Sequence, residues 1–337
     1  MCTRATYLGP EDIVVTGRTF DWVAPVATGM WVFPAGMARH GAAGPDSLEW
    51  TAAHGSVVVS GFDGATVEGM NERGLAVNML YLAESDYGTR APDDPRKPIS
   101  IAIWGQYVLD RFATVAEAVA ALREEPFVPV AVMTPDGHPG TAHLSISDQS
   151  GDSAILEYVD GVLSIHHGRQ YTVMTNSPTY DQQLALNAYW EQVGGAVMLP
   201  GTSRAADRFV RASFYVGAIP PTAGVVKALA GVFGVIRNAS APFGVASPGE
   251  PNVAATRWRT VIDQKNRVYY FESAESPYII WLDFSDLDLS PGAPVLCVAM
   301  NEDAALVADG EYVSGSAAGW LRPADPFAFI PATPAAV

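Results

Sequence analysis

The second residue of the chain carries the group with the clearest chemical potential. Removal of Met1 is expected because the next residue is small, and it would leave Cys2 with a free α-amine beside its own thiol. In model compounds an α-amine titrates at about 7.7 to 8.0 and a thiol at about 8.5, so modest tuning gives a thiolate and a proton carrier near neutral pH. Such a residue supplies a nucleophile and its base together. The alternative is that a cysteine after the initiator is accidental.

Two charged residues lie at the end of the next predicted strand. Residues 12–21 are expected to pair antiparallel with residues 2–8, which would bring Arg18 and Asp21 to the chain terminus. There Asp21 can accept a hydrogen bond from the α-ammonium, and Arg18 can stabilise the thiolate by its charge. A surface salt bridge that closes a hairpin explains the same pair equally well at this point.

The remaining nucleophile and metal-ligand residues form no comparable group. Two cysteines are too few for a disulfide scaffold or a zinc cluster, and Cys297 lies in an apolar stretch where a small buried side chain is expected. The histidines, at positions 40, 54, 138, 143, 166 and 167, show no His-Glu-x-x-His spacing. No Gly-x-Ser-x-Gly elbow and no phosphate-binding glycine loop is present. We therefore expect no metal and no cofactor.

Composition narrows the class of protein further. With 337 residues, 49% of them hydrophobic and 17% charged, the chain falls in the globular class. Its formal net charge of −16 repels phosphate backbones, which argues against a nucleic-acid partner. No apolar run approaches the roughly 20 residues that cross a bilayer, and no secretory signal is recognisable. A cytoplasmic protein is expected as the chain is written, and a periplasmic or secreted one if Met1 replaces a natural signal peptide.

Strand groups and helix pairs alternate as blocks along the chain. Strand patterns cover residues 2–8, 12–21, 56–60, 65–70 and 75–82, then 128–133, 143–147, 154–159, 162–166 and 171–175, and finally 257–263, 267–272 and 278–284. Helical spacing covers residues 99–111, 115–125, 179–189, 205–216 and 225–236. Sheets covered by helix pairs fit this order better than a parallel α/β fold. We expect one domain over residues 2–337, with an extended closing segment from Pro323.

An ordered set of motifs resembles the choloylglycine hydrolases, which are cysteine members of the N-terminal nucleophile hydrolases and include bile salt hydrolases and penicillin V acylases. The resemblance spans most of the chain. It rests on Met1-Cys2-Thr3-Arg4, Arg18-Thr19-Phe20-Asp21-Trp22, residues 70–75, Thr175-Asn176-Ser177-Pro178, and residues 199–201 followed by Asp207-Arg208-Phe209. Each motif is weak singly, and the ordered set is strong.

The resemblance implies an α+β fold, a four-layer αββα sandwich with two central antiparallel sheets, which agrees with the block pattern. It also implies roles for individual residues. Cys2 would be the nucleophile and, through its amine, the proton shuttle, while Arg18 and Asp21 would orient and tune it. Asn176 would donate its side-chain amide to an oxyanion. Arg208 would add positive charge, although a helix arginine covering an apolar neighbour is the alternative.

Two departures from the family pattern bear on the substrate. Where bile salt hydrolases carry an asparagine, this chain has Tyr81, as in the penicillin V acylase pattern. The backbone N–H of Tyr81 could complete the oxyanion hole, and its ring, with that of Trp22, would give an aromatic acyl pocket. The stretch between Asn176 and Arg208 also looks shorter than in intestinal bile salt hydrolases, which bears on how subunits assemble.

The resemblance thus implies hydrolysis of a linear, non-peptide amide in a small N-acyl compound through a thioester, by a homo-oligomer, with a tetramer expected. A penicillin V acylase-like activity ranks first, and an N-acyl homoserine lactone acylase or a bile salt hydrolase is the alternative. Class II glutamine amidotransferases also begin Met-Cys but continue with Gly-Ile, so they rank low. A non-catalytic protein that binds acyl compounds stays open as the alternative from another class.

Overall fold

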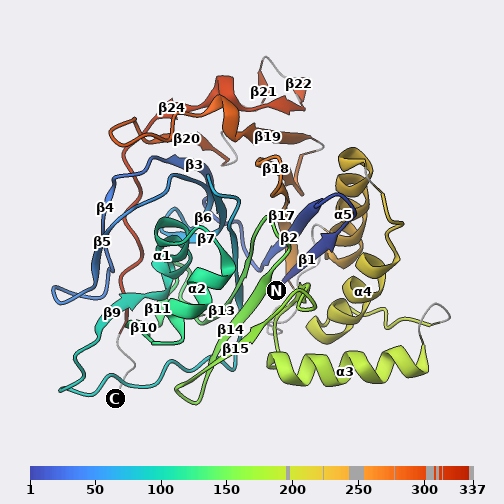
Figure 1. The fold of residues 1–337 in the computed structure, drawn as a ribbon, viewed down its shortest axis with the longest axis horizontal. Helices are drawn as coiled ribbons and strands as arrows, with labels where there is room; N and C mark the ends of the chain where they lie inside the picture. The colour runs from blue at the N-terminus through green and yellow to red at the C-terminus, as the bar shows by residue number, and fades with distance from the viewer. Residues whose placement is uncertain are drawn as a thin grey trace.

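The computed structural model describes residues 1–194, 198–222, 224–242, 254–276, 278–300, 307–308, 311–312 and 314–333. Two large sheets pack face to face, and helices cover the outer face of each (Figure 1). This is the four-layer αββα arrangement that the block pattern and the family resemblance predicted. Among the described residues, no helix is long and apolar enough to span a bilayer.

The first sheet contains the N-terminal strand β1 next to its edge, between β16 and β2. Its strands pair antiparallel except for the last two, which run parallel. In spatial order they are β16 (Val173–Met174), β1 (Cys2–Leu8), β2 (Val14–Trp22), β17 (Ala255–Asp263), β18 (Val268–Ser273), β19 (Ile279–Asp283) and β23 (Gly315–Ser316).

The second sheet is wholly antiparallel. In spatial order its strands are β15 (Val162–His167), β14 (Ser153–Val159), β13 (Ala142–Ser147), β8 (Ala76–Tyr81), β7 (Ala65–Asn71), β6 (Ser56–Gly61), β3 (Gly29–Phe33), β20 (Leu296–Ala299) and β24 (Arg322–Pro323). Short two-stranded pairs complete the structure: β4 (Ala38–His40) with β5 (Glu49–Thr51), β9 (Lys97–Ser100) with β10 (Phe127–Val130), β11 (Val132–Met133) with β12 (Pro139–Gly140), and β21 (Val307–Ala308) with β22 (Glu311–Tyr312).

The helices divide between the two outer faces. α4 (Ala205–Ala218) and α5 (Val225–Ala239) pack on β1, β2, β16 and β17 of the first sheet, and α3 (Tyr180–Val193) packs on α4. α1 (Trp104–Arg111) and α2 (Val115–Leu122) cover the second sheet. Three 3-10 turns span Ile101–Ile103, Phe284–Asp286 and Ala318–Trp320. The predicted capping box forms, because Thr114 Oγ1 accepts from Glu117 N at 3.2 Å.

Two sequence expectations need correction, and a buried strand was missed. The helix predicted over 99–111 begins only at Trp104, because its first residues form β9 and a 3-10 turn in which Ser100 Oγ accepts from Ala102 N. The strand predicted over 128–133 is two strands, β10 and β11, with different partners. β3 was not predicted at all, although it is fully buried between β6 and β20.

Candidate active site

Cys2 lies at the start of β1 and is 3% exposed. The register of β1 with β2 pairs Cys2 with Phe20 and Arg4 with Arg18. Residues opposite each other in an antiparallel pair project from the same face of the sheet. These four side chains therefore face the second sheet, where Cys2, Arg18 and Phe20 line a pocket. The antiparallel pairing predicted for the N-terminus is confirmed.

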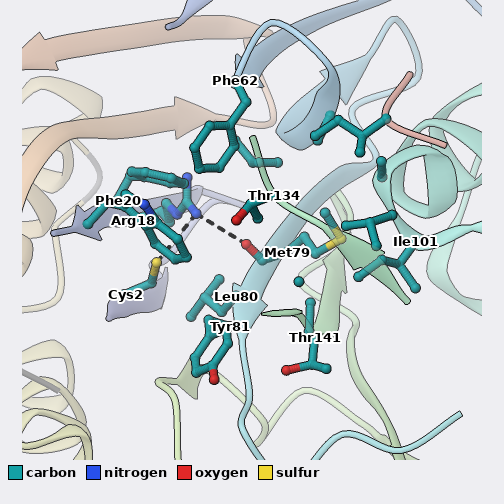
Figure 2. Close-up of a pocket in the computed structure, with 18 residues that line it drawn as sticks. Cys2, Arg18, Phe20, Phe62, Met79, Leu80, Tyr81, Ile101, Thr134 and Thr141 are labelled. Atoms are coloured by element: carbon teal, nitrogen blue, oxygen red, sulfur yellow. Dashed lines mark hydrogen bonds between the residues drawn. The ribbon is translucent and has the colours of Figure 1, made fainter. Parts of the chain in front are cut away.

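The guanidinium of Arg18 reaches the sulfur of Cys2. Arg18 Nη2 lies 3.6 Å from Cys2 Sγ and also donates to the carbonyl oxygen of Met79 at 3.1 Å, and Figure 2 draws both contacts. On its other side, Arg18 Nη1 donates to Glu68 Oε1 at 2.6 Å. Burial alone would lower the pKa of Arg18, but the charges of Glu68 and Cys2 raise it. Arg18 is thus a permanent cation beside the thiol and not a surface residue that closes a hairpin.

Glu68, on β7, was missed at the sequence level. Its carboxylate is 0% exposed and accepts hydrogen bonds from Arg18, Trp258 Nε1, Thr260 Oγ1 and Tyr269 OH, which come from three strands of the opposite sheet. A carboxylate inside an otherwise apolar strand is stable only when it is paired and hydrogen-bonded. That rule was the available signal, because residues 65–70 read Ala-Thr-Val-Glu-Gly-Met.

Asp21 lies on the opposite face of the first sheet from Arg18. Its Oδ1 accepts a hydrogen bond from Thr256 Oγ1 at 2.6 Å, and its Oδ2 is 3.9 Å from Arg208 Nη1. Among the described residues, Asp21 Oδ2 has no hydrogen-bond partner although it is buried. This oxygen is therefore free to accept one more donor close to the chain terminus.

Arg208 reaches the same face from α4. It donates through Nη1 to the carbonyl oxygen of Cys2 and to Thr3 Oγ1, each at 2.5 Å, and through Nη2 to Asn176 Oδ1 at 2.8 Å. Burial lowers its pKa, and the nearby charge of Asp21 opposes that shift. Arg208 fixes the backbone of the cysteine itself, so the alternative of a helix arginine that covers an apolar neighbour is not what the structure shows.

Asn176 and Tyr81 meet at an open edge of β8. The pairing of β8 with β7 ends at Asn78, so the peptide groups of Met79 and Tyr81 on that side have no strand partner. Asn176 Nδ2 donates to the carbonyl oxygen of Tyr81 at 2.6 Å, and Asn176 Oδ1 accepts from the backbone N of Cys2 at 2.5 Å. Since the N–H and C=O of one strand residue point the same way, the N–H of Tyr81 faces this edge too.

A buried His–carboxylate pair holds the segment that carries Asn176. His143 Nε2 lies 2.7 Å from the carbonyl oxygen of Thr175, and His143 Nδ1 lies 2.7 Å from Glu157 Oε1. Glu157 Oε2 accepts from the backbone N of Tyr180 at 2.9 Å. The pair therefore forms hydrogen bonds to both ends of the segment 175–180. Neither residue was singled out from the sequence, although Glu157 is a second carboxylate inside an apolar strand.

A pocket that is open to solvent begins at Cys2 and has a cavity volume of about 80 Å³. Its lining is apolar apart from Arg18 and two threonines. Figure 2 shows Cys2 and Phe20 on one side, Ile101 on the other, and Phe62, Met79 and Tyr81 between them. The remaining lining residues are Trp22, Ala65, Val67, Leu80, Ala102, Val132, Thr134, Gly140, Thr141, Ala142 and Ile330.

Trp22 is held at this pocket by the hairpin of β11 and β12. Its indole Nε1 donates to Asp136 Oδ2 at 2.7 Å, and Asp136 Oδ1 accepts from Thr134 Oγ1 at 2.6 Å. The Trp22 ring packs edge-on to Phe62, Tyr81 and His138. The predicted aromatic contribution of Trp22 and Tyr81 to the pocket is thus present.

Met1 still precedes the cysteine in this structure. Its α-ammonium donates to the backbone oxygen of Asp21 at 2.8 Å, and its own carbonyl accepts from Asp21 N at 2.8 Å. Burial lowers the pKa of this amine. Met1 is therefore buried at the end of β1 and hydrogen-bonded to the backbone of Asp21.

The structure brings all the sequence-predicted site residues together. Cys2, Arg18, Asp21, Asn176 and Arg208 form a connected group, and Tyr81 and Trp22 stand beside it. Cys297 lies apart on β20 and is partly exposed rather than buried, and burial of its thiol still raises its pKa to about 12. Within the described ranges, no three His, Cys, Asp or Glu side chains gather as a metal site.

Comparison with known proteins identifies relatives over nearly the whole chain. Residues 2–304 match the family described as linear amide C–N hydrolases, choloylglycine hydrolase family. Penicillin V acylase from Pectobacterium atrosepticum is 49% identical over 352 aligned positions, which cover 97% of this chain and 92% of that protein.

Solved structures agree. Penicillin V acylase from Agrobacterium tumefaciens superposes with a TM-score of 0.89 at 52% identity, covering 98% of this chain and all of the other. A variant of conjugated bile acid hydrolase from Clostridium perfringens gives a TM-score of 0.76 at 21% identity, over 90% of this chain and 98% of that one. At that identity, the second match shows a shared fold only.

Proposed function

Because this chain belongs to the choloylglycine hydrolase family of linear amide C–N hydrolases, we propose that it cleaves an N-acyl amide with Cys2 as the nucleophile, and that penicillin V is a substrate. One observation carries the proposal. The sulfur of Cys2 lies at one end of an apolar pocket, with a guanidinium nitrogen of Arg18 3.6 Å away. A thiol beside a buried cation at the end of an apolar pocket is suited to acyl transfer.

The reaction begins after Met1 is removed. The α-amine of Cys2 then takes the place of a peptide N–H that now donates to Asn176 Oδ1, and the partnerless Oδ2 of Asp21 becomes available to the ammonium form. The amine accepts the thiol proton, and the thiolate attacks the amide carbon beside Arg18. The same amine returns the proton to the leaving nitrogen, and the resulting thioester is hydrolysed by water.

Two donors are suited to the oxyanion that forms in each step. Asn176 Nδ2 carries two hydrogens, one of which donates to the carbonyl oxygen of Tyr81. The second hydrogen and the N–H of Tyr81 face the edge of β8 next to Cys2. Donors held in place before the reaction act where charge develops, and the loss of one typically costs about 10²- to 10³-fold in rate.

Aromatic residues favour penicillin V within the family. Phe20, Trp22, Phe62 and Tyr81 line the pocket, and aromatic rings pack well against a flat aromatic acyl group such as phenoxyacetyl. The two relatives near 50% identity are themselves named penicillin V acylases. A long-chain N-acyl homoserine lactone, whose acyl chain is also apolar, is the second candidate.

The test compares penicillin V, glycocholate and a long-chain acyl homoserine lactone at equal concentration. Penicillin V is expected to give the highest kcat/KM. Cys2→Ala should abolish hydrolysis of all three, and Cys2→Ser should weaken it severely. Iodoacetamide should label Cys2 and spare Cys297, whose thiol has a pKa of about 12 and is scarcely ionised at neutral pH. Hydrolysis of glycocholate alone would overturn the proposal that penicillin V is a substrate. Activity of Cys2→Ala would overturn the assignment of Cys2 as the nucleophile.

We also propose that the protein is a homo-oligomer that associates through α3. Leu186, Tyr189 and Val193 on this helix are 40%, 59% and 48% exposed, and apolar side chains gathered on one surface favour association. Light scattering after size exclusion should give a multiple of the chain mass, and Leu186→Glu with Tyr189→Glu should reduce it to one chain. A monomeric parent would refute this.

A further inference from the structure

The C-terminal segment 327–333, which we call the strap, crosses the part of the molecule that contains the pocket. It is extended and is fastened by hydrogen bonds on both sides of its length. The contacts are Ile330 N to Gly64 O at 2.8 Å, Ser100 Oγ to Ile330 O at 2.7 Å, Ala332 N to Ala42 O at 2.8 Å, and Thr333 N to Ala131 O at 2.9 Å. A bridge also pairs Ala332 with Val132.

The attachment points are next to residues that line the pocket. Gly64 lies between the lining residues Phe62 and Ala65, and Ser100 directly precedes the lining residue Ile101. Val132 lines the pocket itself. The strap therefore connects three chain segments that are distant in sequence and form parts of one wall.

Ile330 is the strap residue that lines the pocket. Its side chain packs against Gly64 so closely that a Cβ at position 64 would come within 2.7 Å of Ile330 Cγ1. Its backbone is bonded at both N and O, which fixes the peptide, and its partly buried side chain rests on Gly64. Contacts of this kind hold a side chain in one place, as a selective pocket wall requires.

The position of Ile330 along the pocket follows from Ser100. Figure 2 shows Ile101 across the pocket from Cys2. Because Ser100 precedes Ile101 and donates to Ile330, the isoleucine belongs to the end away from the sulfur. An acyl group whose carbonyl is attacked by Cys2 must extend toward that end, since this lining is apolar and the reacting end carries Arg18.

We propose that Ile330 closes the far end of the acyl pocket and sets the length of acyl group that the enzyme accepts. This inference rests on the proposed function, because it assigns the apolar pocket to the acyl side of the substrate. A methylene more or less in an apolar pocket changes discrimination by about 10- to 200-fold, so a change of wall at this single position is large enough to measure.

The experiment measures kcat/KM for a series of straight-chain N-acyl amides that share one amine and differ by two carbons. Ile330→Ala should raise the ratio of kcat/KM for a chain two carbons beyond the parent optimum, relative to the optimum, by about tenfold. Ile330→Phe should lower the same ratio by a similar factor. Ile330→Val, which keeps the β-branched shape, should fall between Ile330→Ala and the parent.

Phe329→Ala is the matched control. Phe329 lies in the same strap and packs on Phe327 at 4.9 Å between ring centroids, but it does not line the pocket. Its truncation should leave the chain-length ratio unchanged. An equal shift in Phe329→Ala, or unchanged ratios in both Ile330→Ala and Ile330→Phe, would overturn the assignment. A parent that hydrolyses penicillin V but no straight-chain member would also overturn the assignment, whereas a parent that hydrolyses neither would refute the proposed function, so the two failures are distinct.

Discussion

Arg18 is shared between the sulfur of Cys2 and the carboxylate of Glu68. One side of its guanidinium faces Cys2 Sγ at 3.6 Å and the other donates to Glu68 Oε1 at 2.6 Å. Glu68 therefore has two effects on the thiolate. It fixes the position of Arg18, and its negative charge offsets part of the positive charge that the sulfur would otherwise feel.

Glu68→Gln separates these two effects. The variant keeps a side chain of similar size but removes the charge, which leaves Arg18 buried without its carboxylate. Breaking a buried ion pair costs about 3 to 5 kcal/mol, so urea unfolding should show a clear loss of stability. The kcat should also fall, because Arg18 loses its fixed orientation, and the pH profile of alkylation at Cys2 should move, because the balance of charge at the sulfur has changed.

Asp110→Asn provides the control for Glu68→Gln. Asp110, on α1, forms a buried ion pair with Arg39 at 3.2 Å. Removing the charge of Asp110 should lower the stability of the fold without changing the surroundings of Cys2. If Glu68→Gln and Asp110→Asn both lose stability but share the parent's alkylation profile, Glu68 is only a structural residue and the argument fails.

At the scale of elements, sequence patterns located most strands and helices but not their contacts. The alternation of β1 and β2 and the periodicity of α4 and α5 follow from side chains that face one layer of the sandwich. β3 escaped because both its faces are buried, so Gly-Met-Trp-Val-Phe shows no alternation. Ser100 to Ile103 was read as helix because its apolar spacing fits either structure, and the pairing of β9 with β10 decides the outcome.

The candidate site was predictable where motifs carry it, and not where pairing between sheets carries it. Cys2, Arg18 and Asp21 are close in sequence, so one hairpin is enough to bring them together. Glu68 comes to Arg18 only through the packing of one sheet on the other. No spacing in the sequence encodes that contact, and the lone signal was a carboxylate in an apolar strand.

The segment 175–180 provides a test of how an element positions a side chain. His143 donates through Nε2 to the carbonyl of Thr175, since a carbonyl can only accept, and Glu157 holds His143 Nδ1 and the N–H of Tyr180. Glu157→Leu removes both bonds and should displace Asn176. We expect kcat to fall about 10²-fold, as for a lost oxyanion donor, with a much smaller change in KM.

Glu157→Gln makes that test specific. Its amide can donate to His143 Nδ1 and accept from Tyr180, so it should recover most of the kcat that Glu157→Leu loses. Asp152→Asn is the control, because Asp152 bonds His167 at 2.8 Å on the same sheet and has no hydrogen bond to residues 175–180. If Glu157→Leu and Asp152→Asn lost the same share of kcat, or if KM in Glu157→Leu rose as much as kcat fell, the cause would be general damage to the fold and not misplacement of Asn176.

At the scale of the whole molecule, the N-terminus lies in the interior rather than at the surface where chain ends usually lie (Figure 1). β1 is bonded to a neighbour on each side, α4 contributes Arg208 from one face, and the second sheet contributes Glu68 from the other. Asn176 comes from the segment between β16 and α3. Assembly of the four layers is therefore what gathers the candidate site around Cys2.

The activity should accordingly depend on a free N-terminal cysteine and not on folding alone. A peptide nitrogen cannot accept the thiol proton, and loss of a general base typically costs about 10²- to 10⁴-fold in rate. We expect a chain carrying an N-terminal extension with a protease site immediately before Cys2 to fold but to hydrolyse amides about 10²- to 10⁴-fold more slowly than the chain with a free Cys2. Cleavage should restore activity in proportion to the free cysteine measured by intact mass, whereas the same extension on Cys2→Ala should gain nothing. Full activity before cleavage would show that another group manages the proton, and the assignment of the α-amine would have to be abandoned.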